Sequence, residues 1–214
     1  DFTKLETDLG VPVIKGAKDL KDLPEYFGND SKPIDLSKHN VKIFAEIVDA
    51  AELSIDKIIE QAQAYVSDGA DVIDIGCLPD TDFPHLEETV SILKSEGFIV
   101  SVDSLDSDEL LRGGGAGADF LLSLKESSLW IANEVGAIPV LIPEHHPQVD
   151  SLYRSMDKLS EDGKPFIADS ILDPIHFGFT ESILRYYNMR ERFPDCEIMM
   201  GVGNLTELTE ADTS

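Results

Sequence analysis

Short apolar runs rich in β-branched residues recur along this chain, and amphipathic segments separate them. This alternation is typical of repeated strand–helix units and predicts a parallel sheet covered by helices. Eight such runs favour a closed barrel over an open sheet, because closure removes both exposed sheet edges. The sequence therefore predicts an α/β protein with the TIM, or (β/α)8, barrel fold. The expected strands are residues 11–15, 42–48, 71–75, 98–102, 118–123, 138–142, 165–169 and 196–201.

The segments between these runs carry the periodicity and the end signals of helices. Apolar residues recur every three or four positions through residues 54–67, which predicts a helix with one buried stripe. Ser54 is a suitable N-cap, and Gly69 follows the predicted helix before the next strand. Further along, Ser107 can cap a helix that we expect to stop within the glycines at 113–115.

Length and charge restrict the class of protein. The 214 residues suit one well-buried domain, so we expect residues 1–214 to form a single barrel. Residues 1–39 then form an N-terminal extension or a displaced final strand–helix unit. The formal net charge of −25 repels nucleic acid and anionic membranes, and this excludes both as partners. The chain has no apolar run near the roughly 18 residues of a membrane span and no signal-peptide pattern, which predicts a cytoplasmic protein.

Polar residues gather where the predicted strands end. Active sites of such barrels lie on the loops after the carboxyl ends of the strands. A buried carboxylate there needs a hydrogen-bond donor, and a flat heterocycle with an amino group beside a ring N–H supplies two donors side by side. The residues that this rule selects are Lys15, Asp49, Asp74, Asp103, Ser104, Ser123, Lys125, Glu144, His145, His146, Asp169, Asp173 and Asn204.

Several of these strand ends carry short motifs. They are GADVIDIG at 69–76, SVDS at 101–104, GAD at 117–119, and Asp-Pro at 173–174 with Phe-Gly at 177–178. In this order, and over roughly residues 40–205, they resemble the successive strand ends of dihydropteroate synthases. The whole chain looks most like the related proteins of archaea and methylotrophs that accompany methanopterin biosynthesis. The segment GVGN at 201–204 looks closer to the methyltetrahydrofolate-binding methyltransferases, a sister group on the same barrel.

The resemblance implies specific roles for four residues. In this superfamily, aspartates that match Asp103 and Asp173 grip the amino-pyrimidinone edge of a pterin. The aspartate that matches Asp74 holds the neighbouring loops and their polar network in place, and the Asn that matches Asn204 lies beside the pterin. The expected ligand is therefore a dihydropterin, or a reduced folate or methanopterin, with Mg²⁺ accompanying any pyrophosphate group.

The chain also departs from the synthase pattern. Leu122 occupies the position of a pterin-binding Asn, and Thr180 occupies that of a substrate-contacting Lys. The first strand-end loop, EIVDAA at 46–51, replaces Asn-x-Thr-Pro-Asp-Ser and offers Asp49 as a further candidate for substrate binding. Three functions therefore stay open. They are a transferase that joins a dihydropterin methylene to an arylamine in folate or methanopterin biosynthesis, a methyl-tetrahydropterin-dependent methyltransferase, and a non-catalytic pterin-binding or scaffold protein.

The order of the strands suggests a circular permutation. Synthases end in an eighth strand with an Arg-x-His anion site, whereas this sequence stops soon after residues 196–201. Residues 11–15 instead precede the family's first strand, and the first and last strands of a closed barrel are neighbours. We hypothesise that this segment fills the eighth place. Lys15 and Lys18 would then bind pyrophosphate as the catalytic cations.

Each candidate also has a purely structural interpretation. Aspartates at strand ends often cap loops, a Gly-Asn pair is a good turn, and lysines often begin a solvated helix. Adjacent histidines after a strand usually point apart, and the two cysteines have no metal-binding spacing, so we expect no metal site of the protein's own. Trp130, Tyr186 and Tyr187 are expected in the core or in the contact of a homodimer.

Overall fold

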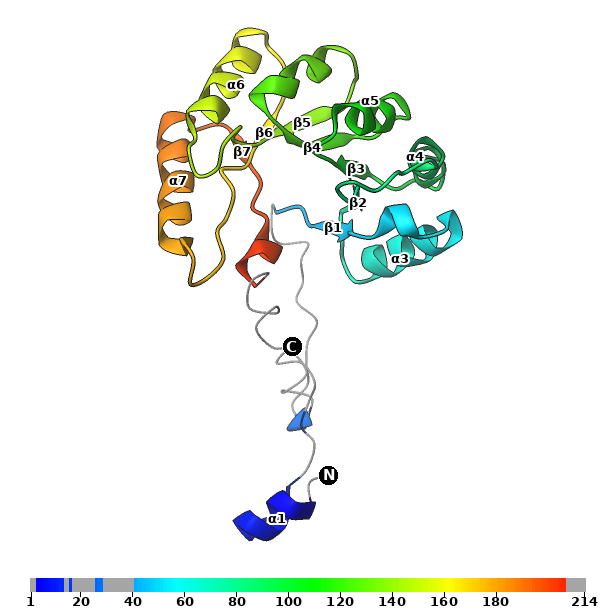
Figure 1. Cartoon of the computed structure of the whole chain (residues 1–214), viewed down its shortest axis with the longest axis vertical. Helices are drawn as coiled ribbons and strands as arrows, with labels where there is room; N and C mark the ends of the chain where they lie inside the picture. Colours follow the sequence, from blue (N-terminus) through cyan, green and yellow to red (C-terminus); the bar gives the residue numbers. More distant parts are fainter. Residues whose placement is uncertain (1–2, 14–15, 17–25, 29–40, 207–214) are drawn as a thin grey trace. The chain divides into compact units, whose positions relative to one another are not determined.

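The computed structural model describes residues 3–13, 16, 26–28 and 41–206 (Figure 1). The chain divides between Val41 and Lys42 into two units, which are described separately. In the first unit, helix α1 (Thr3–Leu9) is followed by a turn, and the Val13 amide donates a hydrogen bond to Glu6 Oε1 at 2.9 Å. In the part of the chain that the structure describes, no helix has both the length and the apolar character needed to cross a membrane.

The second unit is built on one sheet of seven parallel strands. The strands lie in sequence order across the sheet, and each pairs with the next in parallel. Each predicted strand from residues 42–48 onward overlaps one of them. Their bounds are β1 (Phe44–Ile47), β2 (Val72–Gly76), β3 (Val100–Asp103), β4 (Phe120–Leu124), β5 (Ile138–Leu141), β6 (Ile167–Ala168) and β7 (Glu197–Ile198).

Helices cover the outer face of this curled sheet (Figure 1). The predicted helix at 54–67 is confirmed as α3, with Ser54 at its N-cap position. A 3-10 helix, and not an α-helix, connects β4 to β5. The helical bounds are α3 (Ile55–Ser67), α4 (Leu86–Ser95), α5 (Ser107–Gly115), α6 (Asp150–Glu161), α7 (Phe179–Arg192), η3 (Ala50–Glu52), η4 (Glu126–Asn133) and η5 (Val202–Leu205).

Helix α5 differs from its prediction at its N-terminus and agrees with it at its C-terminus. Asp106, not Ser107, is the N-cap, and its carboxylate accepts hydrogen bonds from two amides of the first turn. Gly115 is the last residue of α5, so the helix ends within the predicted run of glycines. A Cβ atom on Gly113 would lie 2.8 Å from Val102 Cγ2, and one on Gly114 would lie 2.9 Å from Val135 Cγ2. These two glycines therefore allow α5 to pack closely against its neighbours.

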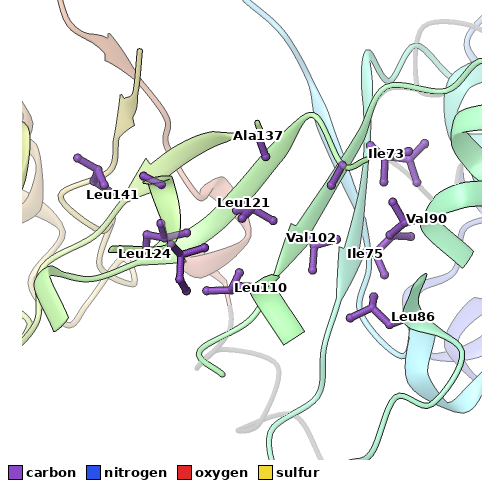
Figure 2. Close-up of a cluster of buried hydrophobic side chains, with 14 of the residues drawn as sticks. Ile73, Ile75, Leu86, Val90, Val102, Leu110, Leu121, Leu124, Ala137 and Leu141 are labelled. Atoms are coloured by element: carbon purple, nitrogen blue, oxygen red, sulfur yellow. The ribbon is translucent and has the colours of Figure 1, made fainter. Parts of the chain in front are cut away.

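The outward side chains of the strands form the main hydrophobic core with the helices. Because side chains alternate along a strand, every second residue faces the helical layer. Figure 2 shows Ile73 and Ile75 of β2 on the same side as Leu86 and Val90 of α4, and these residues belong to one buried cluster. Val102, Leu110, Leu121, Leu124, Ala137 and Leu141 continue this cluster along the sheet (Figure 2).

The inward side chains form a second, smaller apolar cluster, which shows that the sheet curls. The Phe44 and Phe120 rings stack edge to face with centroids 5.2 Å apart, although β2 and β3 lie between their strands. Inward residues of distant strands can meet in this way only if the sheet closes around them. The cluster consists of Val72, Phe120, Leu122, Val140 and Ile167, with Phe44, Ile138 and Met199 packed against it.

The sheet is a half-barrel of the TIM type, with seven strands in the described residues instead of the expected eight. Of the predicted strand at residues 11–15, Val11–Val13 are described and are not in a strand, while Ile14 and Lys15 lie outside the described residues. The permuted eighth strand therefore stays a prediction. The other seven strands place the candidate site, because their carboxyl ends meet at one end of the inner face.

Candidate functional site

Four carboxylates follow the inner apolar cluster toward the carboxyl ends of the strands. Glu46, Asp74 and Asp169 each stand two positions after an inward apolar residue, and strand alternation puts them on the same inner face. Glu46 and Asp74 are paired in register, and Asp103 is in register with Gly76 at the end of β2. Carboxylate oxygens of Glu46, Asp74 and Asp103 lie within 4.8 Å of one another.

Asp74 is the most buried member of this acidic cluster. Its exposed fraction is 4%, and Ser101 Oγ donates a hydrogen bond to its Oδ1 at 2.6 Å. Burial raises the pKa of Asp74 to about 8, with help from the negative charges of Asp103 and Glu46 and against the Ser101 hydrogen bond. Asp74 therefore keeps its proton at neutral pH, where an ionised Asp74 would lie against two further carboxylates.

Asp103 depends on an irregularity in β4. Burial raises the pKa of Asp103, and a hydrogen bond with the Ser123 side chain opposes that rise. Ser123 has a φ of 64°, where the register of β4 against β5 shifts between Leu121 and Leu124. Leu122 remains buried in the inner apolar cluster, so the polar partner that β4 gives to Asp103 is Ser123.

Asp169 is a buried member of the site that was predicted only as a strand-end residue. It accepts hydrogen bonds from the Tyr186 hydroxyl and, at 2.7 Å, from the Ile171 amide. Burial raises the pKa of Asp169, these two hydrogen bonds oppose the rise, and the charge of Asp103 adds to it while His146 opposes it. Asp169 therefore connects the acidic cluster electrostatically to the loops after β5 and β6.

Asp173 is held by two cationic or protonatable side chains. His146 Nε2 lies 2.6 Å from its Oδ1, and Arg185 Nη2 donates to its Oδ2 at 2.8 Å. Burial by itself would raise the pKa of Asp173, but the hydrogen bonds from Arg185 and His146 outweigh burial and the pKa is lowered. Asp173 is therefore ionised at neutral pH and has a protein partner on each oxygen.

Asp103 and Asp173 lie at the same end of the sheet, and a series of interactions between other residues links them. Asp103 interacts electrostatically with Asp169, Asp169 with His146, and His146 is hydrogen-bonded to Asp173. The resulting site is acidic on the side of β1 to β3 and carries His146 and Arg185 on the side of β5 to β7. The binding roles that were predicted for the two aspartates remain predictions.

The other predicted site residues lie in different surroundings. Asp49 is exposed at the start of η3 and makes no capping hydrogen bond with its side chain. Asn204 Nδ2 donates to the Leu172 carbonyl at 3.2 Å, which ties the loop after β7 to the loop after β6. Lys15 and Lys18 lie outside the described residues.

The cluster of three carboxylates has the chemistry of a hard-cation site as well as of a hydrogen-bonding site. Carboxylate oxygens are the protein ligands that Mg²⁺ uses. A proton on Asp74 also offsets the negative charge of the three carboxylates, as a metal ion would. The cluster therefore suits either a proton or a divalent cation. Sequence reasoning missed the linked roles of Ser123, His146, Arg185 and Tyr186, because their partners are distant along the chain.

Comparison with known proteins supports the fold. No family model matches the chain. An uncharacterized protein of Methanocaldococcus jannaschii is 29% identical to it over 83% of the chain, and the match covers 37% of that protein. The chain thus spans about a third of the length of this relative.

Solved dihydropteroate synthases share the architecture at low sequence identity. The enzyme from Xanthomonas albilineans, in complex with 7,8-dihydropteroate, superposes with a TM-score of 0.59 at 16% identity, over 79% of this chain and 76% of that one. The Yersinia pestis enzyme with a pterine-sulfa conjugate gives a TM-score of 0.59 at 18% identity, over 84% and 79%. The chain therefore has the fold of dihydropteroate synthases.

Proposed function

We propose that this chain is a pterin-binding protein related to the dihydropteroate synthases. The observation that carries the proposal is the convergence of three carboxylates, the buried Asp74 and Asp169 and the half-buried Asp103, at the carboxyl end of the inner face of the half-barrel. In the solved relatives with this fold, one synthase holds 7,8-dihydropteroate and another holds a pterine-sulfa conjugate. The fold and the acidic end of the sheet together support a ligand rich in N–H donors.

The mixed protonation of the acidic cluster suits a pterin edge. An ionised carboxylate on Asp103 can accept hydrogen bonds from the amino group and the adjacent ring N–H of an amino-pyrimidinone. A protonated Asp74 can donate one hydrogen bond, either to a neighbouring carboxylate or to a ring acceptor. A ring with alternating donors and acceptors therefore satisfies both groups, whereas a ligand with acceptors alone would add no donor to the one that Ser123 gives Asp103.

We assign to this site the synthase-like transfer of a dihydropterin methylene to an arylamine. Such a substitution needs fixed carboxylates near the pterin and cations near the leaving pyrophosphate. Asp103 meets the first requirement. For the second we propose Lys15 and Lys18, with Mg²⁺ on the pyrophosphate.

One observation favours a methyl-tetrahydropterin-dependent methyltransferase as the second candidate. The Asn204 side chain donates a hydrogen bond to the carbonyl of Leu172. Leu172 directly precedes Asp173, a residue that is predicted to bind the pterin. The synthase Lys is also replaced by Thr180. A methyltransferase would bind a methyl-tetrahydropterin more tightly than a dihydropterin pyrophosphate.

Titration of the purified protein with a dihydropterin, its pyrophosphate ester and a methyl-tetrahydropterin, followed by pterin fluorescence, tests these proposals. We expect the first two ligands to bind and pyrophosphate to be released when an arylamine is added. Asp103→Asn should weaken dihydropterin binding by about 10- to 100-fold, because a charge-assisted hydrogen bond contributes about 1.5–3 kcal/mol.

Asp56→Asn is the matched control, because Asp56 is an exposed residue of α3 on the outer layer. The Asp56→Asn variant should bind the dihydropterin with the same affinity as the wild type. Absence of binding for all three pterins would reject the pterin assignment. Tight binding without turnover would instead support a scaffold or binding protein.

A further inference from the structure

His146, Asp173 and Arg185 form a hydrogen-bonded triad at the side of the site opposite the acidic cluster. His146 comes from the loop after β5, Asp173 from the loop after β6, and Arg185 from helix α7. The side chains of Asp173 and Arg185 are 13% and 12% exposed, whereas His146 is 33% exposed. The imidazole is therefore the member of the triad that a ligand can reach.

Arg185 anchors the triad to the main chain. Its Nη2 donates to the Ile171 carbonyl at 2.7 Å and to Asp173, and its Nε donates to the Ser170 carbonyl at 3.2 Å. Ile171 has a φ of 66°, a conformation that a β-branched residue rarely adopts. The guanidinium thus holds an unusual loop conformation and, through it, the orientation of Asp173.

The charge state of Asp173 decides which nitrogen of His146 carries a proton. The lowered pKa keeps Asp173 ionised at neutral pH, and an ionised carboxylate only accepts hydrogen bonds. His146 Nε2 must therefore donate across the 2.6 Å contact. In the neutral imidazole the lone pair then lies on Nδ1, to which the described residues donate no hydrogen bond.

We propose that His146 is the proton acceptor of this site, with Nδ1 facing the N–H group of a bound amine and with Asp173 and Arg185 as its positioning residues. The charged groups that act on the imidazole are Asp173 and Asp169, both from the segment after β6, with Arg185 bound to the far oxygen of Asp173. This arrangement fixes the tautomer of the histidine in the way that a buried aspartate does in hydrolytic triads.

The inference rests on the proposed function for the identity of the amine. In the substitution, the C–N bond forms while the C–O bond to pyrophosphate breaks, and pyrophosphate leaves with the electron pair of that bond. The nitrogen then carries one proton too many. His146 Nδ1 accepts this proton and passes it to water, so the imidazole returns to its starting state.

The alternative role is purely structural, with His146 serving only to tie the loop after β5 to the loop after β6. His146→Gln separates the two roles, because the Gln amide nitrogen can replace Nε2 as donor to Asp173 but supplies no basic nitrogen. If His146 is the acceptor, this variant should keep the wild-type Tm and dihydropterin affinity and lose about 100-fold or more in the transfer rate. A wild-type rate in the variant would overturn the proposal.

Nitrogen NMR of protein labelled with ¹⁵N-histidine tests the proposal without any turnover. His146, assigned by its absence in His146→Gln, should be the Nε2–H tautomer, and p-aminobenzoate added with a dihydropterin should shift Nδ1. An Nδ1–H tautomer, or an Nδ1 signal that stays unchanged with both ligands bound, would refute it. If no pterin binds, the proposed function fails, and the tautomer still decides whether the triad is built as inferred.

Discussion

Replacement of Asp74 by Asn is the perturbation whose energy follows most directly from the structure. The pKa of Asp74 is about 8 in the folded protein, against an ordinary value of 3.8. In the unfolded chain this carboxyl ionises above pH 3.8, while in the folded protein it keeps its proton up to about pH 8. The stability of the wild type should therefore fall as pH rises between these two values and level off above the higher one.

The size of the effect follows from the same two values. Each unit of pKa difference corresponds to about 1.4 kcal/mol, so the penalty at pH 7 reaches about 4 kcal/mol. Asn cannot ionise, and its amide oxygen can still accept the hydrogen bond of Ser101. We expect Asp74→Asn to match the wild type near pH 4 and to be more stable by up to about 4 kcal/mol at pH 7.

Urea unfolding followed by circular dichroism at several pH values from 4 to 8 measures this difference. Asp56→Asn on the exposed surface of α3 is the control and should leave the pH dependence unchanged. A variant that is less stable than the wild type at pH 7 would refute the reasoning. That result would mean that Asp74 is ionised and stabilised by a bound cation.

Two further substitutions test how α5 and α7 are fitted to the sheet. Gly113→Ala should destabilise the protein by about 1–3 kcal/mol, because its Cβ would lie 2.8 Å from Val102 Cγ2. The control Gly115→Ala meets no atom within 4 Å and should be neutral or stabilising by up to about 1 kcal/mol, so equal effects in urea unfolding would contradict the packing of α5. Arg185→Lys keeps the charge but not the forked contacts with two carbonyls and Asp173, and should lower the unfolding free energy by about 1–3 kcal/mol. An unchanged unfolding free energy for this variant would mean that Arg185 does not anchor the loop.

The sequence predicted most of the sheet because its strands are buried on both faces. Residues 72–73 and 120–122, for example, are apolar on both faces of their strands, and a parallel sheet between an inner cluster and a helical layer requires this. The rule that polar site residues lie at the carboxyl ends of strands also predicted the positions of Asp74 in β2 and Asp103 in β3. Local patterns were less informative about close packing, because the run of glycines predicted where α5 ends but not the close contacts of Gly113 with Val102 and of Gly114 with Val135.

The partners of the site residues could not be predicted. Arg185 and Asp173 are 12 residues apart, and His146 and Asp173 are 27 residues apart, so only the assembled fold brings them together. The bulge that gives Ser123 to Asp103 depends on the register between β4 and its neighbour, which no local pattern specifies. Family resemblance directed attention to Leu122 instead, which is a core residue here.

The central claim is that carboxylates at the end of the inner face recognise the amino-pyrimidinone edge of a pterin. Comparison of a dihydropterin with the corresponding dihydrolumazine, which carries a carbonyl in place of the amino group, tests this most directly. We expect the dihydropterin to bind at least about 10-fold more tightly, because the lumazine removes a donor and places an acceptor against a carboxylate. Equal affinities, or a preference for the lumazine, would contradict the claim.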